Sequence, residues 1–97
     1  MKIGEAIKEL RKDQGLSQQD LAEAAGITQT ALSQIETGSR PGEQTLTNLS
    51  KALKVPEVMI HLLTYDRNDV PKDKRVLYDK LFPVVQSLIK EMVGKEK

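Results

Sequence analysis

Four uncharged polar side chains at helical spacing are the residues of this sequence best suited to a chemical role. Gln29, Thr30, Ser33 and Gln34 fall on one side or flank of a helix over residues 29–37, at about 100° per residue. Ala31, Leu32 and Ile35 fall on the opposite side, where we expect the core. A glutamine amide can pair with adenine through two hydrogen bonds, and a threonine methyl can contact a thymine methyl. Such a face is chemically suited to contact with base edges, and an ordinary solvated face would more often carry Lys and Glu.

Catalytic and metal-binding arrangements are missing from the sequence. The single histidine, His61, has no second histidine or cysteine near it with which to bind a metal, and the chain contains no cysteine. The glycines at 38 and 42 are not followed by the Lys-Ser/Thr pair of a phosphate-binding loop. The serines lack a partner that could act as a base; they are Ser17, Ser33, Ser39, Ser50 and Ser87. The sequence predicts a protein that is not an enzyme and that needs no metal or cofactor.

Length and charge limit the architecture. A chain of 97 residues fits one domain with at most one appended element. Residues 1–65 hold seven Lys/Arg and eight Asp/Glu, for a net charge of −1, whereas residues 66–97 hold eight and six, for +2. Such a weak overall field argues against nucleic-acid binding through general basicity. Binding would have to rely on a local patch and on backbone amides.

The pattern of apolar residues predicts an all-α fold, with five short helices in residues 1–65. Apolar spacing and capping signals place these helices at 3–14, 18–25, 29–36, 43–53 and 56–63. Gly15 ends the first, Ser17 and Asp20 form a capping-box pair for the second, and Thr28 caps the third. No alternating run of β-branched residues indicates a strand.

The junction between the second and third helices carries a more specific signal. The helices at 18–25 and 29–36 meet at Ala25-Gly26-Ile27, where glycine permits a sharp turn and Ile27 can fill the space between them. Two short helices joined in this way have the geometry of a DNA-binding helix-turn-helix.

The combination resembles the Cro/phage-repressor (XRE) family of helix-turn-helix regulators. The resemblance covers about residues 3–63, and the matching residues are Leu16, Ser17, Gln18, Leu21, Ala22, Gly26, Ile27, Leu32, Ser33, Ile35, Glu36, Gly38, Pro41, Leu46, Leu49, Ala52 and Leu53. It implies a compact five-helix domain over residues 1–65 that binds the major groove of double-stranded DNA. It also implies a homodimer on a near-palindromic operator.

The resemblance also assigns supporting roles. It implies that Gln18 contacts a phosphate and supports Gln29, and that Arg11 and Glu36 form a buried structural ion pair. Further backbone contacts are expected from Thr37, Ser39 and Arg40, which end or follow the recognition helix. Lys12 and Lys2 are additional candidates, although a solvated lysine explains Lys12 equally well.

Residues 66–97 extend beyond this domain as a polar linker followed by an amphipathic helical segment over about 71–93. Its apolar stripe predicts a dimerisation surface made of Leu77, Leu81, Phe82, Val85, Leu88, Ile89 and Met92. The alternative is that the stripe folds back to cover its own domain. Pro83 lies within the segment and is expected to kink or break the helix.

The favoured function is a sequence-specific transcriptional regulator, a repressor rather than an activator. The alternatives are an antitoxin whose C-terminal segment neutralises a toxin while the domain regulates its own operon, a restriction–modification controller, and a sporulation-type regulator that exchanges partners through its C-terminal helices. No membrane span or signal peptide is recognisable, so we expect a cytoplasmic protein with no membrane partner.

Overall fold

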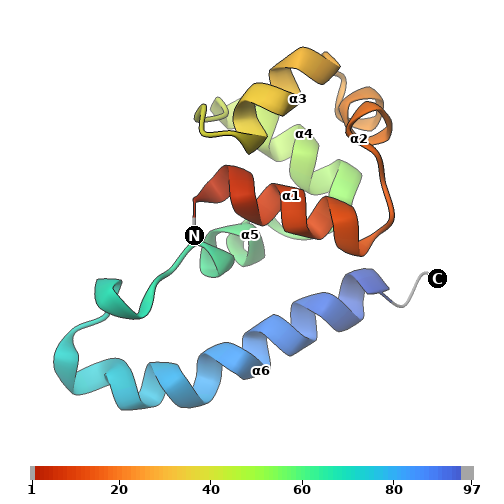
Figure 1. Cartoon of the computed structure of the whole chain (residues 1–97). Helices are drawn as coiled ribbons and strands as arrows, with labels where there is room; N and C mark the ends of the chain where they lie inside the picture. Colours follow the sequence, from red (N-terminus) through yellow and green to blue (C-terminus); the bar gives the residue numbers. More distant parts are fainter. Residues whose placement is uncertain (1, 95–97) are drawn as a thin grey trace.

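A computed structural model describes residues 2–94, and this part of the chain is entirely helical apart from its loops. In Figure 1 the short helices lie above the long C-terminal helix. The short helices are α1 (Ile3–Asp13), α2 (Gln18–Ala25), α3 (Gln29–Glu36), α4 (Glu43–Leu53) and α5 (Glu57–Leu63). The predicted all-α fold class is confirmed. The predicted bounds of α2, α3 and α4 match the structure, and those of α1 and α5 differ by one residue at one end.

Local capping explains why the helix bounds could be predicted. The Ser17 amide donates to Asp20 Oδ2 at 3.1 Å, and the Asp20 amide donates to Ser17 Oγ at 3.0 Å. The Ala31 amide donates to the Thr28 hydroxyl oxygen at 3.0 Å at the start of α3. Gly26 ends α2 with φ of 71°, a left-handed conformation that costs glycine little. Gly26 therefore fixes the end of α2 and the Thr28 cap fixes the start of α3, so both ends of the turn between these helices are determined locally.

The Ser17 amide and hydroxyl lower the pKa of Asp20. A lowered folded-state pKa means that the ionised carboxylate supports the fold above the ordinary value of 3.8. That support is lost as the pH falls through the lower folded-state pKa.

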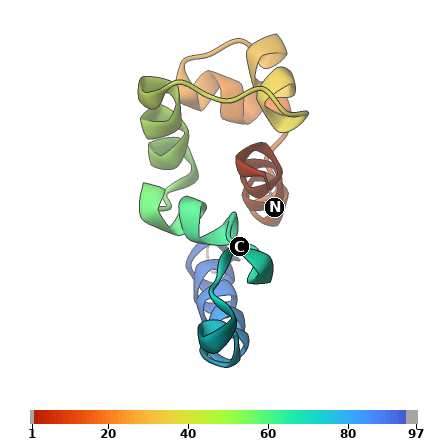
Figure 2. The same ribbon diagram turned by 90° about the vertical axis from the view of Figure 1, so that its left-hand side faces the viewer.

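The core lies between the five short helices, which Figure 2 shows wrapped around it. Its largest fully buried side chains are Ile7, Leu10, Leu21, Leu32, Leu49, Leu53, Val55, Ile60 and Ile89. All but the last come from residues 1–65. Ile27, between α2 and α3, is partly buried and packs against this core as the sequence predicts.

The predicted linker contains one short 3₁₀ turn, Arg67–Asp69, and a second, Lys72–Lys74, lies where the helical segment was expected to begin, so the last helix starts at Arg75. Arg67 Nε lies 2.9 Å from Asp79 Oδ1, which joins the first turn to the last helix. The Tyr78 hydroxyl donates to the Tyr65 carbonyl oxygen at 3.2 Å. The segment is therefore folded against the following helix.

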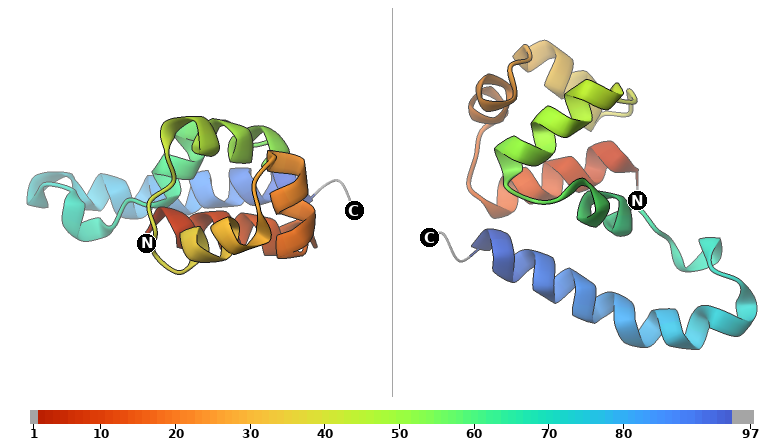
Figure 3. Two further views of the ribbon diagram at one scale, coloured as in Figure 1. Left: turned by 90° about the horizontal axis from the view of Figure 1, so that it is seen from above. Right: turned by 180° about the vertical axis from the view of Figure 1, so that it is seen from behind.

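The last helix, α6 (Arg75–Gly94), runs through Pro83 without interruption. Pro83 was expected to kink or break the helix, and it does not break it, since α6 is one continuous helix that Figure 3 shows with a gentle curve. Proline removes the amide that would donate to the Asp79 carbonyl. Both residues are exposed, so water can serve that carbonyl and the helix can continue.

Helix α6 returns beneath α1 and α5 and completes the core there (Figures 1 and 3). Ile89 is 1% exposed within the core cluster, and Val85 is partly buried against it. The fold-back alternative therefore describes this side of the helix. The other side of α6 faces away from the domain.

Candidate nucleic-acid interface

The predicted base-reading residues lie together on the outer side of α3. Gln29, Thr30 and Gln34 are exposed and Ser33 is half-buried. With Gln18 they line a shallow hollow of about 310 Å³. Such a surface presents several hydrogen-bonding groups without a fixed charge, which suits contact with base edges.

The inner side of α3 anchors the helix in the domain. Leu32 and Ile35 are buried, as predicted, but Ala31 is only half-buried because it lies at the edge of the inward face. These contacts set the side of α3 that remains exposed.

Arg11 and Glu36 form a buried bidentate ion pair between α1 and α3. Arg11 Nε donates to Glu36 Oε2 at 2.8 Å, and a terminal guanidinium nitrogen donates to Oε1 at 3.1 Å. The other terminal nitrogen donates to the Leu16 carbonyl at 2.8 Å. This pair ties the C-terminal end of α3 to α1 and to the loop before α2.

Gln18 extends the same hydrogen-bond network. Its Nε2 donates to Glu36 Oε1 at 3.0 Å, and the side chain also borders the hollow that contains Gln29. The structure thus places Gln18 beside α3, where its amide oxygen could still accept a hydrogen bond.

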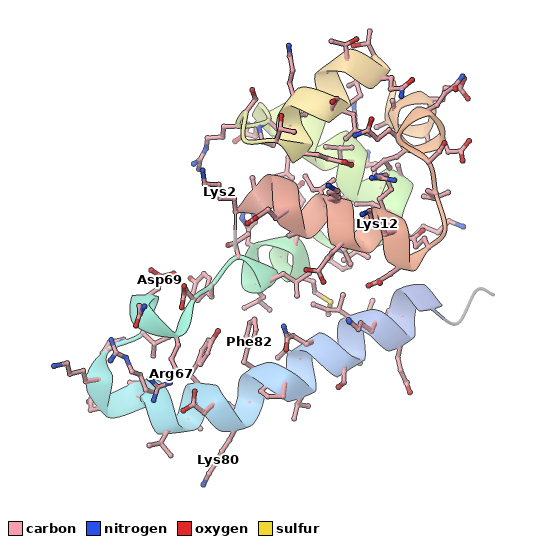
Figure 4. All side chains as sticks on the ribbon, in the orientation of Figure 1. Lys2, Lys12, Arg67, Asp69, Lys80 and Phe82 are labelled. Carbon is pink, nitrogen blue, oxygen red and sulfur yellow. The ribbon has the colours of Figure 1, made fainter. Side chains whose placement is uncertain are left out.

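The predicted DNA-backbone contacts are separated on the surface. Thr37, Ser39 and Arg40 are exposed at the end of α3 and in the loop that follows. The Thr37 hydroxyl donates to the Ser33 carbonyl at 2.9 Å, so its hydrogen is already used within the helix. Lys12 is exposed on α1, where Figure 4 labels it, and does not line the hollow at α3.

A basic hollow adjoins this surface and was only partly foreseen. Its volume is about 430 Å³, and it is lined by Lys2, Arg40 and His61, from three different segments. The sequence drew attention to Lys2 and Arg40 separately, but nothing in their spacing indicated that His61 on α5 would join them. A phosphate entering this hollow would meet the cations of Lys2 and Arg40 and no carboxylate of the lining.

Gly4 is the residue whose importance the sequence analysis missed. A Cβ atom there would overlap the Ile35 carbonyl oxygen and crowd Glu36 Cα at 3.2 Å. Only glycine permits α1 to approach the backbone of α3 this closely. The one available signal was a glycine within the first turn of a predicted amphipathic helix.

The described residues 2–94 also bear on metal binding and on membrane crossing. In this range no group of three or more His, Cys, Asp or Glu side chains is arranged to hold a metal ion. Within the same described range, no helix has the length and apolar character needed to cross a membrane.

Comparison with known proteins identifies relatives of the N-terminal region. The chain matches the helix-turn-helix family over residues 7–60. It is 36% identical over 73 residues to the HTH-type transcriptional regulator SinR of Bacillus licheniformis, covering 73% of this chain and 63% of the relative. The same values hold for SinR of Bacillus subtilis (strain 168). The chain thus spans less than two thirds of these relatives, and no solved structure gives a significant match.

Proposed function

Because the chain belongs to the Cro/C1-type (XRE) helix-turn-helix family of DNA-binding transcriptional regulators, we propose that it represses transcription from specific duplex sites. In this proposal α3 enters the major groove and reads base edges. A protein with this role acts in the cytoplasm of a bacterial cell.

The uncharged polar face of α3 is the observation that carries the proposal. Gln29, Thr30 and Gln34 project from a helix whose other side is locked into the core, with Ser33 between them. Base contacts discriminate only when the donor and acceptor groups have fixed positions. The bidentate Arg11–Glu36 pair and the Gln18 hydrogen bond supply that fixation at one end of α3.

Contacts with the DNA backbone position the domain in this proposal. Ser39 and Arg40 follow α3, and Gly42 precedes α4 without a side-chain cap on the helix amides. Free amides at a helix start attract phosphate. Together with the basic hollow at Lys2, Arg40 and His61, they could contact phosphates at the C-terminal end of α3.

Pairing of two chains through α6 completes the proposal. Leu77, Leu81 and Leu88 remain at least half exposed, although Ile89 and Val85 of the predicted dimer surface are occupied within their own chain. Fully burying a leucine contributes about 1.5–3 kcal/mol. Several such side chains on each chain are sufficient to offset much of the entropy of association.

The test begins with selection of binding sites from a random duplex pool by the purified protein. We expect one enriched motif, and we expect Gln29→Ala and Ser33→Ala to lose preference for it while their melting temperatures stay nearly unchanged. A Gln29→Ala variant that binds the motif with unchanged preference would show that α3 is not the reading element.

Arg40→Ala provides the complementary measurement. Its affinity should fall for every duplex sequence, and the slope of log K against log salt should decrease in magnitude by about one unit. Lys80→Ala is the matched control, since Lys80 is also an exposed cation but lies on α6, on the side facing away from α3 (Figure 4). An equal change in both variants would point to general electrostatics.

An antitoxin is the second candidate, because the outer face of α6 offers an apolar surface to a different protein. Leu77, Leu81 and Val84 are all more than half exposed on it. Stable co-purification with the product of a neighbouring gene, and loss of that complex in Leu81→Glu, would favour the antitoxin.

A further inference from the structure

We propose that the basic hollow is a phosphate-binding site in which the imidazole of His61 contacts the phosphate in its protonated form. The phosphate belongs to the DNA backbone, so the site rests on the DNA-binding function proposed above and makes DNA affinity depend on pH. A free phosphate ion offers the same chemistry, and the two sources are separable by experiment.

Three cationic or basic side chains from different segments meet in the basic hollow. Lys2 precedes α1 (Figure 4), Arg40 lies in the loop after α3, and His61 lies on α5. All three residues are exposed, and neither ion pair of the described residues 2–94 includes them. Their charge is therefore available to an anion that enters from solvent.

Carboxylates are kept out of this hollow. Among residues 2–94, none of the lining side chains is acidic. Four carboxylates lie near the lining residues in sequence, and each accepts a hydrogen bond elsewhere: Glu5 from the Lys2 amide, Glu36 from Arg11, Glu57 from the Thr47 hydroxyl and Asp66 from the Asn68 amide. The charged groups that face His61 across the hollow are Lys2 and Arg40, and both favour an anion.

The backbone adds to the attraction for an anion. Helix α1 begins at Ile3, so the amides of Ile3 and Gly4 have no acceptor within the helix, and both residues line the hollow. The first turn is also the positive end of the helix dipole. Gly4 and Gly38 carry no side chain that would fill the space. Since a water occupies about 30 Å³ in the liquid, a hollow of about 430 Å³ has room for a hydrated phosphate group.

The position of the hollow favours a phosphate of the DNA backbone. A second hollow of about 350 Å³ shares Lys2, Gly4 and Gly38 with it and extends to Thr37, directly after the last residue of α3. A continuous concave surface thus leads from the C-terminal end of α3 to His61. A DNA strand that follows this surface away from the bases read by α3 reaches the basic hollow.

His61 makes the site sensitive to protons. Histidine is the side chain that ordinarily changes charge between pH 5 and 8. A phosphate beside the imidazole favours the protonated form, because opposite charges attract. Binding therefore takes up a proton, and by linkage the affinity for phosphate rises as the pH falls. Lys2 and Arg40 keep their charge throughout this range, so they hold the phosphate at both ends of it.

The affinity of the full chain for the selected duplex, measured at pH 6 and pH 8 at one ionic strength, tests the proton. We expect the wild type to bind about two- to fivefold more tightly at pH 6, the effect of one exposed ion pair. His61→Gln should bind at pH 6 as weakly as the wild type does at pH 8. His61→Lys, which is charged at both pH values, should bind tightly at both.

Other titrating groups do not confuse this comparison. His61 is the one histidine of the chain. The pKa of Asp20 is lowered from 3.8 and that of Tyr78 is raised from 10.0, so neither changes charge between pH 6 and 8. The α-amino group does titrate near this range, but it is common to the wild type and both variants.

Nuclear magnetic resonance of the single histidine ring distinguishes the two sources of phosphate. Inorganic phosphate is titrated into the full chain against chloride at the same ionic strength, and the selected duplex is titrated separately. A shift of the His61 signals with duplex, reduced in Arg40→Ala, supports the DNA backbone as the source. A shift with inorganic phosphate alone supports the phosphate site and assigns it to a free ion.

Absence of a response of His61 to either titrant would overturn the proposal. So would a His61→Gln protein that keeps the wild-type difference between pH 6 and 8 while its ring-signal control is lost, or a His61→Lys protein that binds as weakly as His61→Gln at pH 8. A wild-type protein that binds no duplex at either pH contradicts the DNA-binding function instead, and the titration with inorganic phosphate then decides the site by itself.

Discussion

At the scale of single residues, the orientation of α3 depends on one buried carboxylate. Both Glu36 oxygens accept hydrogen bonds from Arg11, and Oε1 also accepts from Gln18. The side chains of Arg11 and Glu36 are 9% and 1% exposed. No solvent is available to replace a lost partner, so the network acts as a unit that links α1, α2 and α3.

Glu36→Ala should therefore lower the free energy of unfolding by about 3–5 kcal/mol, because it leaves the Arg11 guanidinium buried without its counter-charge. Denaturant titration measures the change, with Glu23→Ala as the control for an exposed carboxylate on α2. Replacing both partners with apolar residues, as in Arg11→Met with Glu36→Leu, should recover much of the loss. Equal stabilities of Glu36→Ala and Glu23→Ala would contradict a structural role for the pair.

The sequence predicted which residues lie on and around α3 better than it predicted their contacts. Gln29, Thr30, Ser33 and Gln34 could be grouped because helical periodicity determines sidedness. The bond from Gln18 to Glu36 depends on how α2 and α3 pack in three dimensions, which periodicity does not encode. His61 beside Arg40 is a similar case, since their segments are far apart in sequence.

At the scale of elements, the contact between α1 and α3 depends on a missing side chain. Gly4 lies directly against the Ile35 carbonyl, and both segments are rigid helix at that point. The neighbour is backbone, so rotation of a side chain cannot relieve the overlap that a methyl group would create.

Gly4→Ala should destabilise the protein by about 1–3 kcal/mol or more, as overpacking does in a close-packed interior. It should also weaken DNA binding by shifting α3. Gly42→Ala is the control, because a Cβ at Gly42 meets nothing within 4 Å and its φ of −70° is ordinary. Thermal unfolding of both variants provides the comparison, and an unchanged melting temperature in Gly4→Ala would mean that α1 and α3 can separate at little cost.

The side of α6 that packs on the domain leads to a second prediction at this scale. Among the α6 side chains that the structure describes, Ile89 is the one in the fully buried core, so Ile89→Ala should cost about 2–5 kcal/mol. Leu88→Ala, one residue away but 51% exposed, should have a much smaller effect on the unfolding of the monomer. Unfolding at a concentration low enough to dissociate dimers measures both. Equal effects would show that α6 does not rest on its own domain.

Five helices could be placed from the sequence because their start and stop signals are local, whereas the role of α6 could not. Apolar residues cover more than one side of this helix, and a count of their spacing merges these sides into a single stripe. Only the position of Ile89 beside Leu10 of α1 and Leu63 of α5 separates the side that folds back from the side that stays free. Pro83 was misjudged for a related reason: the cost of proline depends on whether water can reach the orphaned carbonyl.

At the scale of the whole molecule, the division between DNA-binding domain and C-terminal extension can be tested by cutting the chain. The matched family region ends at residue 60 and α5 ends at Leu63, so a chain of residues 1–65 retains every short helix. It loses the outer face of α6 and also the Ile89 side chain that covers the core. Truncation therefore removes the proposed contact between two chains and, at the same time, lowers the free energy of unfolding.

The truncated chain should fold, with a lower free energy of unfolding, sediment as a monomer and bind the selected duplex more weakly than the full chain. The full-length Leu81→Glu variant separates the two losses, because it disrupts the outer face of α6 but keeps Ile89 in place. If weak binding comes from lost association, the truncated chain and Leu81→Glu should show similar affinities at a temperature where both are folded. If the truncated chain binds DNA far more weakly than Leu81→Glu at that temperature, the contact of α6 with α1 also helps to hold α3 in its binding position. A truncated chain that remains dimeric in sedimentation would instead place the principal interface within the five short helices.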